Sequence, residues 1–128
     1  MANKYMLDSS AWIEYFSGSE LGAKLKDIVE RDTTLTSILS IAEISDKFSR
    51  EKERFDKFLA FIKNMSSVIN ITILSCSESG GLKAERRTIK KKFSLADAII
   101  YLSAKENSCT LITLDHDFES MDNVKVIE

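Results

Sequence analysis

Four acidic residues carry the chemistry that this sequence could perform. Each follows an apolar, strand-like segment or lies near the start of a helical one: Asp8, Glu43, Asp97 and Asp115. They are far apart in the chain, yet all four can lie at the same edge of one sheet. Carboxylates that meet repel one another unless a cation lies between them. Such hard oxygen ligands favour Mg²⁺ or Mn²⁺, which promote phosphoryl-transfer chemistry. The pattern therefore predicts a metal-dependent nuclease.

Two of these acids also have a purely structural interpretation. Glu43 and Asp97 each stand three residues after a serine, Ser40 and Ser94, which is the pattern of a helix capping box. Taken singly, each is better explained as a cap, and Asp8 or Asp115 alone could flank a cap or start a turn. A metal site requires all four acids to share one sheet edge, whereas independent caps do not. The two roles are compatible, because a capping position fixes the direction of a ligand side chain.

Other kinds of site lack their signatures. His116 is the single histidine and lies between two aspartates, but no other histidine or cysteine lies at zinc-ligand spacing. Cys76 and Cys109 are isolated, which predicts reduced thiols in a cytoplasmic protein. No apolar run has the length of a membrane span, and the first residues do not resemble a signal peptide. The glycine motifs of dinucleotide-binding, P-loop and serine-hydrolase proteins are absent from the sequence.

The acids need a scaffold, and hydrophobic patterning predicts alternating strands and helices. Strands are expected over residues 5–7, 33–36, 68–73, 110–113 and 124–127. Helices are expected after Ser10, Ser19, Ser40 and Ser94 as N-caps, and over residues 55–65 and 77–91. This alternation predicts an α/β fold with a parallel sheet, in which ligands bind beyond the carboxyl ends of the strands. The length of 128 residues predicts a single domain over 1–128.

Positive charge is concentrated in one segment, although the net charge is −2. On the predicted helix over residues 77–91, a basic run is by default a solvated face. Beside a metal site it becomes a contact for the phosphate backbone of a nucleic acid. The candidate RNA-binding residues are Arg86, Arg87, Lys90, Lys91 and Lys92. Phe61 lies off the apolar face of its predicted helix and hints at a protein partner.

Four segments together resemble the PIN domain family. Leu7–Glu14 resembles the opening of these domains, Thr36–Ile44 the segment of their second acid, Phe93–Ile100 that of the third and Leu111–Phe118 that of the fourth. Each motif alone is weak, but the ordered set is specific and covers essentially the whole chain. By its size the sequence is most similar to the VapC-type toxins of prokaryotic toxin–antitoxin pairs.

The resemblance implies a three-layer α/β/α sandwich with a parallel five-stranded sheet, and ribonuclease activity that depends on Mg²⁺ or Mn²⁺. Asp8, Glu43, Asp97 and Asp115 match the family's acidic quartet, with Asp8, Asp97 and Asp115 as metal ligands. Ser9, Thr113 and Asp117 match its supporting positions. Such toxins form homodimers. Their antitoxins cover a helical hairpin, here around residues 44–48 and 55–65, and can place a basic side chain in the acidic site. The pair Gly80–Gly81 departs from the pattern and leaves the start of that helix undefined.

The sequence thus predicts hydrolysis of RNA phosphodiesters by the toxin of a type II toxin–antitoxin pair. Two alternatives stay open. One is a binding module with the same fold and no activity, and the other is a metal-dependent nuclease that acts on DNA. No aromatic RNA-binding platform is present that would separate RNA from DNA.

Overall fold

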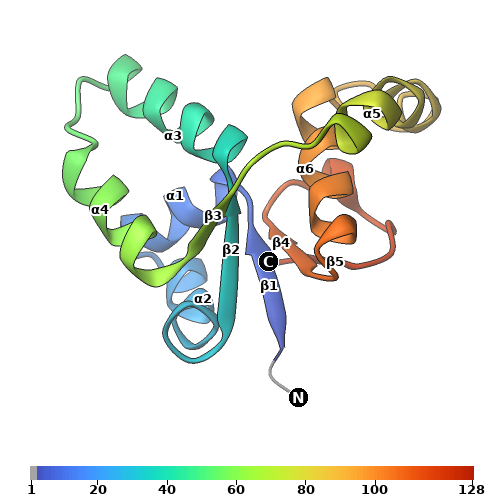
Figure 1. The fold of residues 1–128 in the computed structure, drawn as a ribbon. Helices are drawn as coiled ribbons and strands as arrows, with labels where there is room; N and C mark the ends of the chain where they lie inside the picture. Colours follow the sequence, from blue (N-terminus) through green and yellow to red (C-terminus); the bar gives the residue numbers. More distant parts are fainter. Residues whose placement is uncertain (1–2) are drawn as a thin grey trace.

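The computed structural model describes residues 3–128, which form one parallel sheet between two layers of helices (Figure 1). The strands are β1 (Lys4–Leu7), β2 (Thr33–Ser37), β3 (Ser67–Ile69), β4 (Thr110–Thr113) and β5 (Val124–Val126). The helices are α1 (Ser9–Ser17), α2 (Glu20–Arg31), α3 (Ile38–Arg50), α4 (Asp56–Met65), α5 (Ile73–Arg86) and α6 (Leu95–Glu106), with a short 3₁₀ helix η1 (His116–Phe118). The predicted five-stranded α/β/α sandwich is confirmed.

Each face of the sheet has its own hydrophobic core, because successive side chains of a strand point to opposite faces. On β1, Met6 packs with Ala98 and Leu111 against α5 and α6. Its neighbour Leu7 packs with Trp12 and other side chains from α1 to α4. Figure 1 shows α1 to α4 on one side of the sheet and α5 with α6 on the other. The sheet therefore holds the two groups of helices in fixed positions relative to each other.

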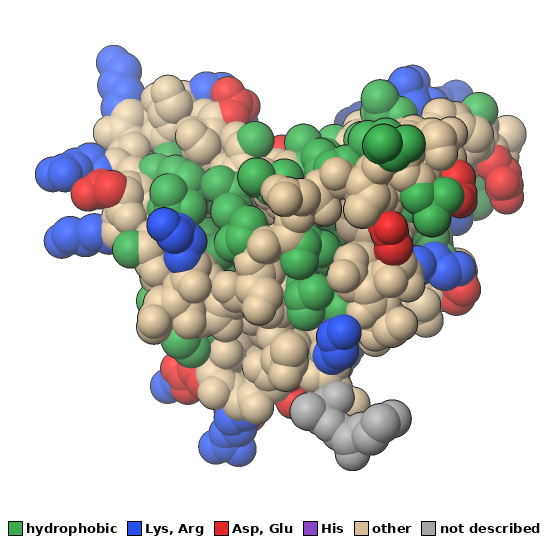
Figure 2. Space-filling view, in the orientation of Figure 1, with side chains coloured by type: hydrophobic (Ala, Val, Ile, Leu, Met, Phe, Trp, Pro, Cys, Tyr) green, Lys and Arg blue, Asp and Glu red, His purple; other side chains and the backbone are tan. Residues whose placement is uncertain are grey.

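The strand order is β3-β2-β1-β4-β5, and all neighbouring strands are parallel. From β1 the chain first adds β2 and β3 on one side and then β4 and β5 on the other. The connections consequently diverge at the carboxyl ends of β1 and β4, which is where open α/β sheets bind ligands. Asp8 directly follows β1 and Asp115 lies two residues beyond the end of β4. Figure 2 shows the surface hollowed at the top of the view, between the α3 side and the α5–α6 side.

Two glycines shape the connection from α1 to α2. Gly18 ends α1 with a φ of 72°, in the left-handed region that favours glycine. Gly22, in the first turn of α2, lies against α1, and a Cβ added there would be 2.4 Å from the backbone carbonyl oxygen of Glu14. The two helices therefore cross at a distance that only glycine permits.

The expected strand over residues 68–73 is wrong beyond Ile69. Strand β3 pairs with β2 in a register that ends with Ile69 beside Ser37, where β2 turns into α3. Residues after Ile69 thus have no strand to pair with. Helix α5 begins at Ile73, because the Thr72 side chain accepts a hydrogen bond from the backbone N–H of Ser75. The helix expected over residues 77–91 therefore starts earlier and ends earlier, and Gly80 and Gly81 lie inside it.

Two predicted caps are also wrong. Helix α3 starts three residues before the position expected from Ser40, with Ser37 as its N-cap, and Ser40 is buried inside the helix. Glu43 consequently lies beyond the first turn and takes no part in a capping box. Helix α1 is capped by Asp8 rather than by Ser10. The caps predicted at Ser19 and Ser94 are confirmed. Within residues 3–128, no helix is long and apolar enough to cross a membrane.

Candidate metal centre

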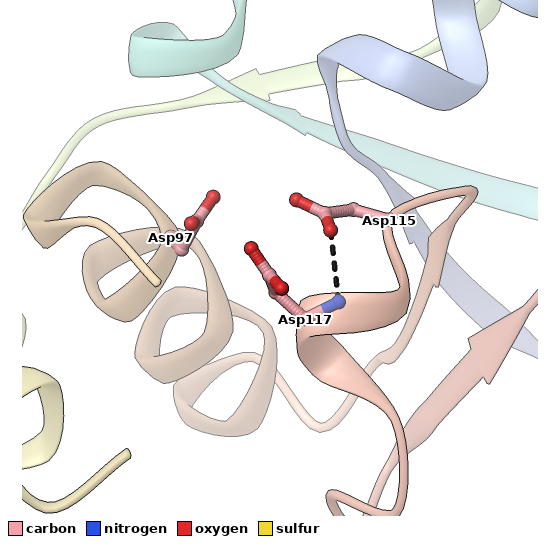
Figure 3. Close-up of side chains that lie close together, drawn as sticks. All are labelled: Asp97, Asp115 and Asp117. Atoms are coloured by element: carbon pink, nitrogen blue, oxygen red, sulfur yellow. Dashed lines mark hydrogen bonds between the residues drawn. The ribbon is translucent and has the colours of Figure 1, made fainter. Parts of the chain in front are cut away.

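Three carboxylates meet beyond the carboxyl end of β4. Oxygen atoms of Asp97, Asp115 and Asp117 all lie within 4.8 Å of one another. Asp97 comes from the first turn of α6, whereas Asp115 and Asp117 come from η1 and the residue before it. Figure 3 shows the three side chains pointing into a common space between these elements. The three residues are half-buried, so solvent only partly screens their mutual repulsion.

A capping box fixes the direction of Asp97. Its Oδ2 accepts a hydrogen bond of 2.8 Å from the backbone N–H of Ser94, and its own N–H donates to Ser94 Oγ over 3.0 Å. The capping role of this acid is thus confirmed, and the capped side chain is one of the three that meet in the cluster. Burial raises the pKa of the Asp97 carboxyl, and the nearby charges of Asp115 and Asp117 raise it further. A cation at this place would lower the pKa, because an opposite charge nearby favours the ionised carboxylate.

Hydrogen bonds within the turn direct the other two acids. The N–H of Asp117 donates to Asp115 Oδ1 over 2.8 Å, the bond drawn in Figure 3. The N–H of Asp115 donates to the hydroxyl of Thr113 over 3.0 Å. The predicted supporting residues Thr113 and Asp117 thus lie at the cluster. Asp117 contributes a carboxylate to it, which is more than the supporting role that the sequence suggested.

Asp8 lies outside this cluster. It is 5% exposed, and its oxygens accept hydrogen bonds from the Ser10 hydroxyl (2.6 Å), the Ala11 N–H (2.9 Å) and the Thr113 hydroxyl. Burial is the largest cause that raises the pKa of Asp8 from 3.8 to about 6, against the effect of these hydrogen bonds. The structure therefore brings Asp97 and Asp115 together but leaves Asp8, the third expected ligand, outside the cluster, connected to Asp115 by two hydrogen bonds that share the Thr113 hydroxyl.

Glu43 faces the same region from α3. Burial raises its pKa from 4.5 to about 6, with a further contribution from the charges of Asp97 and Asp8. A hydrogen bond from Ser9 acts in the opposite direction. Of the two serines after β1, Ser9 therefore serves Glu43, and Ser10 serves Asp8. The sequence interpretation missed this role of Ser10, although a hydroxyl two residues after an aspartate is a common partner for its carboxylate.

The basic segment lies mostly outside the helix on which it was expected. Helix α5 ends at Arg86, and Lys90, Lys91 and Lys92 lie in the loop before α6. Arg87 donates to the Phe93 carbonyl over 2.7 Å, and Lys90 pairs with Glu119 at 3.3 Å. Lys91 and Lys92 are exposed. The loop nevertheless runs directly into the start of α6, which carries Asp97.

The donor set of the cluster fits a hard divalent cation. It consists of carboxylate oxygens alone, which suit Mg²⁺ or Mn²⁺, and lacks the sulfur and imidazole groups that zinc favours. His116 is exposed, and its ring contacts Glu119 at 3.1 Å and Glu128 at 3.5 Å. It is not one of the three residues of the cluster.

The sequence model of one family, described as the PIN domain, matches residues 5–124. No curated protein sequence matches the chain. Among solved structures, a toxin–antitoxin complex from Klebsiella pneumoniae is similar over 95% of this chain and 96% of the other, with 24% identity and a TM-score of 0.73.

Two further structures have the same fold. VapBC2 from Rickettsia felis, bound to a DNA fragment from its promoter, is 16% identical over 98% of this chain and 99% of the other, with a TM-score of 0.70. VapC20 from Mycobacterium tuberculosis, described as a Sarcin–Ricin loop cleaving toxin, is 15% identical over 97% and 99%, with a TM-score of 0.73. At these identities the likeness establishes the fold.

Proposed function

Since the chain belongs to the PIN domain family, we propose that it is a Mg²⁺- or Mn²⁺-dependent endoribonuclease and the toxin of a type II toxin–antitoxin pair. The meeting of Asp97, Asp115 and Asp117 within 4.8 Å is the observation that carries this proposal. Three carboxylates held together by two separate elements are unfavourable without a cation. The similar folds of toxins and toxin–antitoxin complexes support the biological role.

The three acids of the cluster would hold the metal ion. When bound, such an ion lowers the pKa of a coordinated water and stabilises charge on the scissile phosphate. Asp8 would orient the site through its hydrogen bond with Thr113, whose hydroxyl also accepts from the Asp115 N–H, and would add negative charge near it. Glu43 would accept a hydrogen bond from the attacking water on the α3 side. The four predicted catalytic acids thus keep distinct roles, with Asp117 added as a ligand.

The RNA backbone would be held by the basic residues that follow the end of α5. Lys91 and Lys92 are exposed and lie in the loop that leads into α6, the helix that carries Asp97. Phosphate contacts of this kind make affinity depend on salt. Replacing both lysines with methionine is expected to weaken RNA binding at low salt and to leave Mn²⁺ binding unchanged.

Cleavage of a mixed RNA pool by the purified protein tests the proposal. Cutting is expected with Mn²⁺, and none is expected with EDTA or for Asp97→Asn. The matched control is Asp46→Asn, which removes one charge from an exposed aspartate paired with Arg50 on α3. Cutting that survives EDTA, or full activity of purified Asp97→Asn, would contradict the metal-dependent mechanism.

Two alternatives have defined outcomes in the same experiment. A non-catalytic binding module would leave RNA and DNA intact in every condition, from protein shown to be folded and free of a bound inhibitor. A nuclease that acts on DNA would cut a structured DNA pool faster than the RNA pool, again only with metal. The preference for RNA rests on the resemblance and on the neighbour described as a Sarcin–Ricin loop cleaving toxin.

An aromatic surface on α1 and α4 is the proposed contact for an antitoxin. Tyr15, Phe16, Phe58 and Phe61 line a depression of about 300 Å³ together with Lys57. The Tyr15 and Phe61 rings stack at 5.7 Å, so Phe61 is half-buried against α1 rather than free. Phe61→Asp is expected to abolish co-purification with the antitoxin, whereas Lys63→Asp, on the exposed side of α4, is expected to leave it unchanged.

A homodimer is proposed from the resemblance to VapC-type toxins. Exposed apolar side chains are available for it, including Ile38 at the start of α3 and Leu95 at the start of α6. Size-exclusion chromatography with light scattering is expected to give twice the mass of one chain, and Ile38→Lys with Leu95→Lys is expected to give the mass of a monomer. A monomeric parent protein at micromolar concentration would contradict the proposal.

A further inference from the structure

Arg86 binds the backbone of the turn that carries two of the three clustered acids. Its Nε and Nη2 donate to the Asp117 carbonyl over 3.0 and 2.9 Å, and Nη2 also donates to the Glu119 carbonyl. We propose that Arg86 is a positioning residue of the metal centre, which holds η1 so that Asp115 and Asp117 face Asp97. This inference rests on the proposed metal-dependent function.

The turn has few hydrogen bonds of its own, so an external support can fix its orientation. Helix η1 has only three residues, and 3₁₀ segments of this length have poor hydrogen-bond geometry of their own. Its internal bonds run from the Phe118 and Glu119 N–H groups to the Asp115 and His116 carbonyls. The carbonyls of Asp117 and Glu119 accept from Arg86 instead. A guanidinium group presents several donors in a rigid planar fork and can bind both carbonyls at once.

Arg86 lies at the end of α5, so its contact connects the turn to a different layer of the protein. Residue 86 ends α5, which packs along α6, the helix of Asp97. The hydrogen bonds of Arg86 therefore connect the η1 side of the cluster to the helical layer that carries the third acid. Arg86 is half-buried, whereas Glu119, the partner of Lys90 and His116 in the same turn, is exposed. The arginine is accordingly the less screened of these supports.

The turn is expected to fold without Arg86. Phe118 is 1% exposed and packs on Phe93 with ring centroids 5.4 Å apart, and the Thr113 hydroxyl still accepts the Asp115 N–H. Loss of the arginine should therefore make the orientation of the Asp115 and Asp117 carboxylates less fixed, without unfolding the domain. Partners of metal ligands commonly change metal affinity by 10- to 100-fold when they are removed.

The direction in which removal of Arg86 changes metal affinity distinguishes a positioning role from a purely electrostatic one. If Arg86 acted only as a nearby cation, its removal would strengthen metal binding, because it would relieve the repulsion between two positive charges. If it only contacted RNA, as the basic segment suggested, metal binding without RNA would not change. Positioning alone predicts weaker metal binding in the absence of RNA.

Mn²⁺ titration of the RNA-free protein, followed by electron paramagnetic resonance, tests the inference. Arg86→Met is expected to raise the dissociation constant for Mn²⁺ by about tenfold, and Arg86→Lys, which keeps the charge without the planar fork, by a smaller factor. The matched control Arg31→Met removes one exposed charge on α2, and it should bind Mn²⁺ like the parent protein. Thermal melting in EDTA establishes that each variant is folded.

The outcomes distinguish this inference from the proposed function. A parent protein that binds no Mn²⁺ would overturn the metal-dependent function itself. A parent that binds Mn²⁺, together with an Arg86→Met variant that binds it equally or more tightly, would overturn only the role of Arg86. If Arg86→Met does not fold, Arg86→Lys decides, and affinity equal to the parent's overturns the inference. As a second readout, higher Mn²⁺ concentration should restore RNA cleavage by Arg86→Met, which loss of an RNA contact would not allow.

Discussion

At the scale of single residues, Asp8 and Asp97 each combine a structural and a proposed functional role. Both act as helix caps, since Asp8 accepts from the Ala11 N–H and Asp97 takes part in the box with Ser94. Capping fixes the directions of the carboxylates before any metal binds, so little reorganisation is needed at the site. The same placement buries the two groups and raises their pKa values. The burial that orients these two carboxylates therefore lowers the stability of the metal-free protein at neutral pH.

Asp8→Asn is expected to stabilise the metal-free protein at neutral pH. The folded pKa of Asp8 is raised from 3.8 to about 6, so the contribution of this group to stability is fully present below pH 3.8 and is lost as pH rises through 6. At about 1.4 kcal/mol per pKa unit, the loss reaches about 3 kcal/mol. Asparagine can still accept from Ala11 and donate to Thr113 without a charge.

Urea unfolding in EDTA at pH 4 and pH 7.5 measures this effect. The free energies of unfolding of Asp8→Asn and the parent should be similar at pH 4 and should differ by up to about 3 kcal/mol at pH 7.5, in favour of the variant. Asp46→Asn, an exposed control, should show no such change between the two pH values. A variant less stable than the parent at pH 7.5 would mean that the charged cap outweighs the cost of burial.

At the scale of the elements, packing requires glycine at one helical position but not at two others. Gly80 and Gly81 lie inside α5 with no heavy atom within 4 Å of an added Cβ, so nothing in the packing requires them. Gly22 lies in α2 against the backbone of α1, where an added Cβ would meet the Glu14 carbonyl. Sequence alone does not separate these cases, because the difference arises from what lies opposite each residue.

Gly80→Ala and Gly81→Ala are each expected to stabilise the protein by about 1 kcal/mol, because alanine is favoured in helices and restricts the unfolded chain. Gly22→Ala is the matched comparison and should lower the free energy of unfolding, because α1 and α2 must move apart. Urea unfolding of the three variants measures both directions. Destabilisation by both alanines in α5 would indicate that this helix is bent or covered by a partner at Gly80–Gly81.

At the scale of the whole molecule, a metal ion would connect the sheet, α6 and η1. Mn²⁺ at 100 times its dissociation constant should stabilise the folded chain by about 2.7 kcal/mol. Thermal melting should therefore rise by several degrees with Mn²⁺ in the parent protein and by much less in Asp97→Asn. An equal rise in both proteins would place the bound ion away from the cluster.

The sequence determined the layered architecture and the candidate acids. Alternating apolar segments required a parallel sheet with helices on both faces, and Asp8 and Asp115 had to lie at its carboxyl edge because they follow strands. The local capping pattern at Ser94–Asp97 was also sufficient to predict the box that the structure contains. These features depend on neighbours in the chain, which the sequence displays directly.

Only the tertiary structure decided which acids meet and what supports them. Asp117 joins Asp97 and Asp115 because η1 turns its side chain toward α6, whereas Asp8 is held outside the cluster by hydroxyls from two segments. Arg86 reaches the η1 carbonyls because α5 ends beside that turn, and β3 stops at Ile69 because β2 offers no further partner. In each case the outcome depends on contacts between segments that are distant in the chain. The order of residues does not give the distances between such segments in the folded protein.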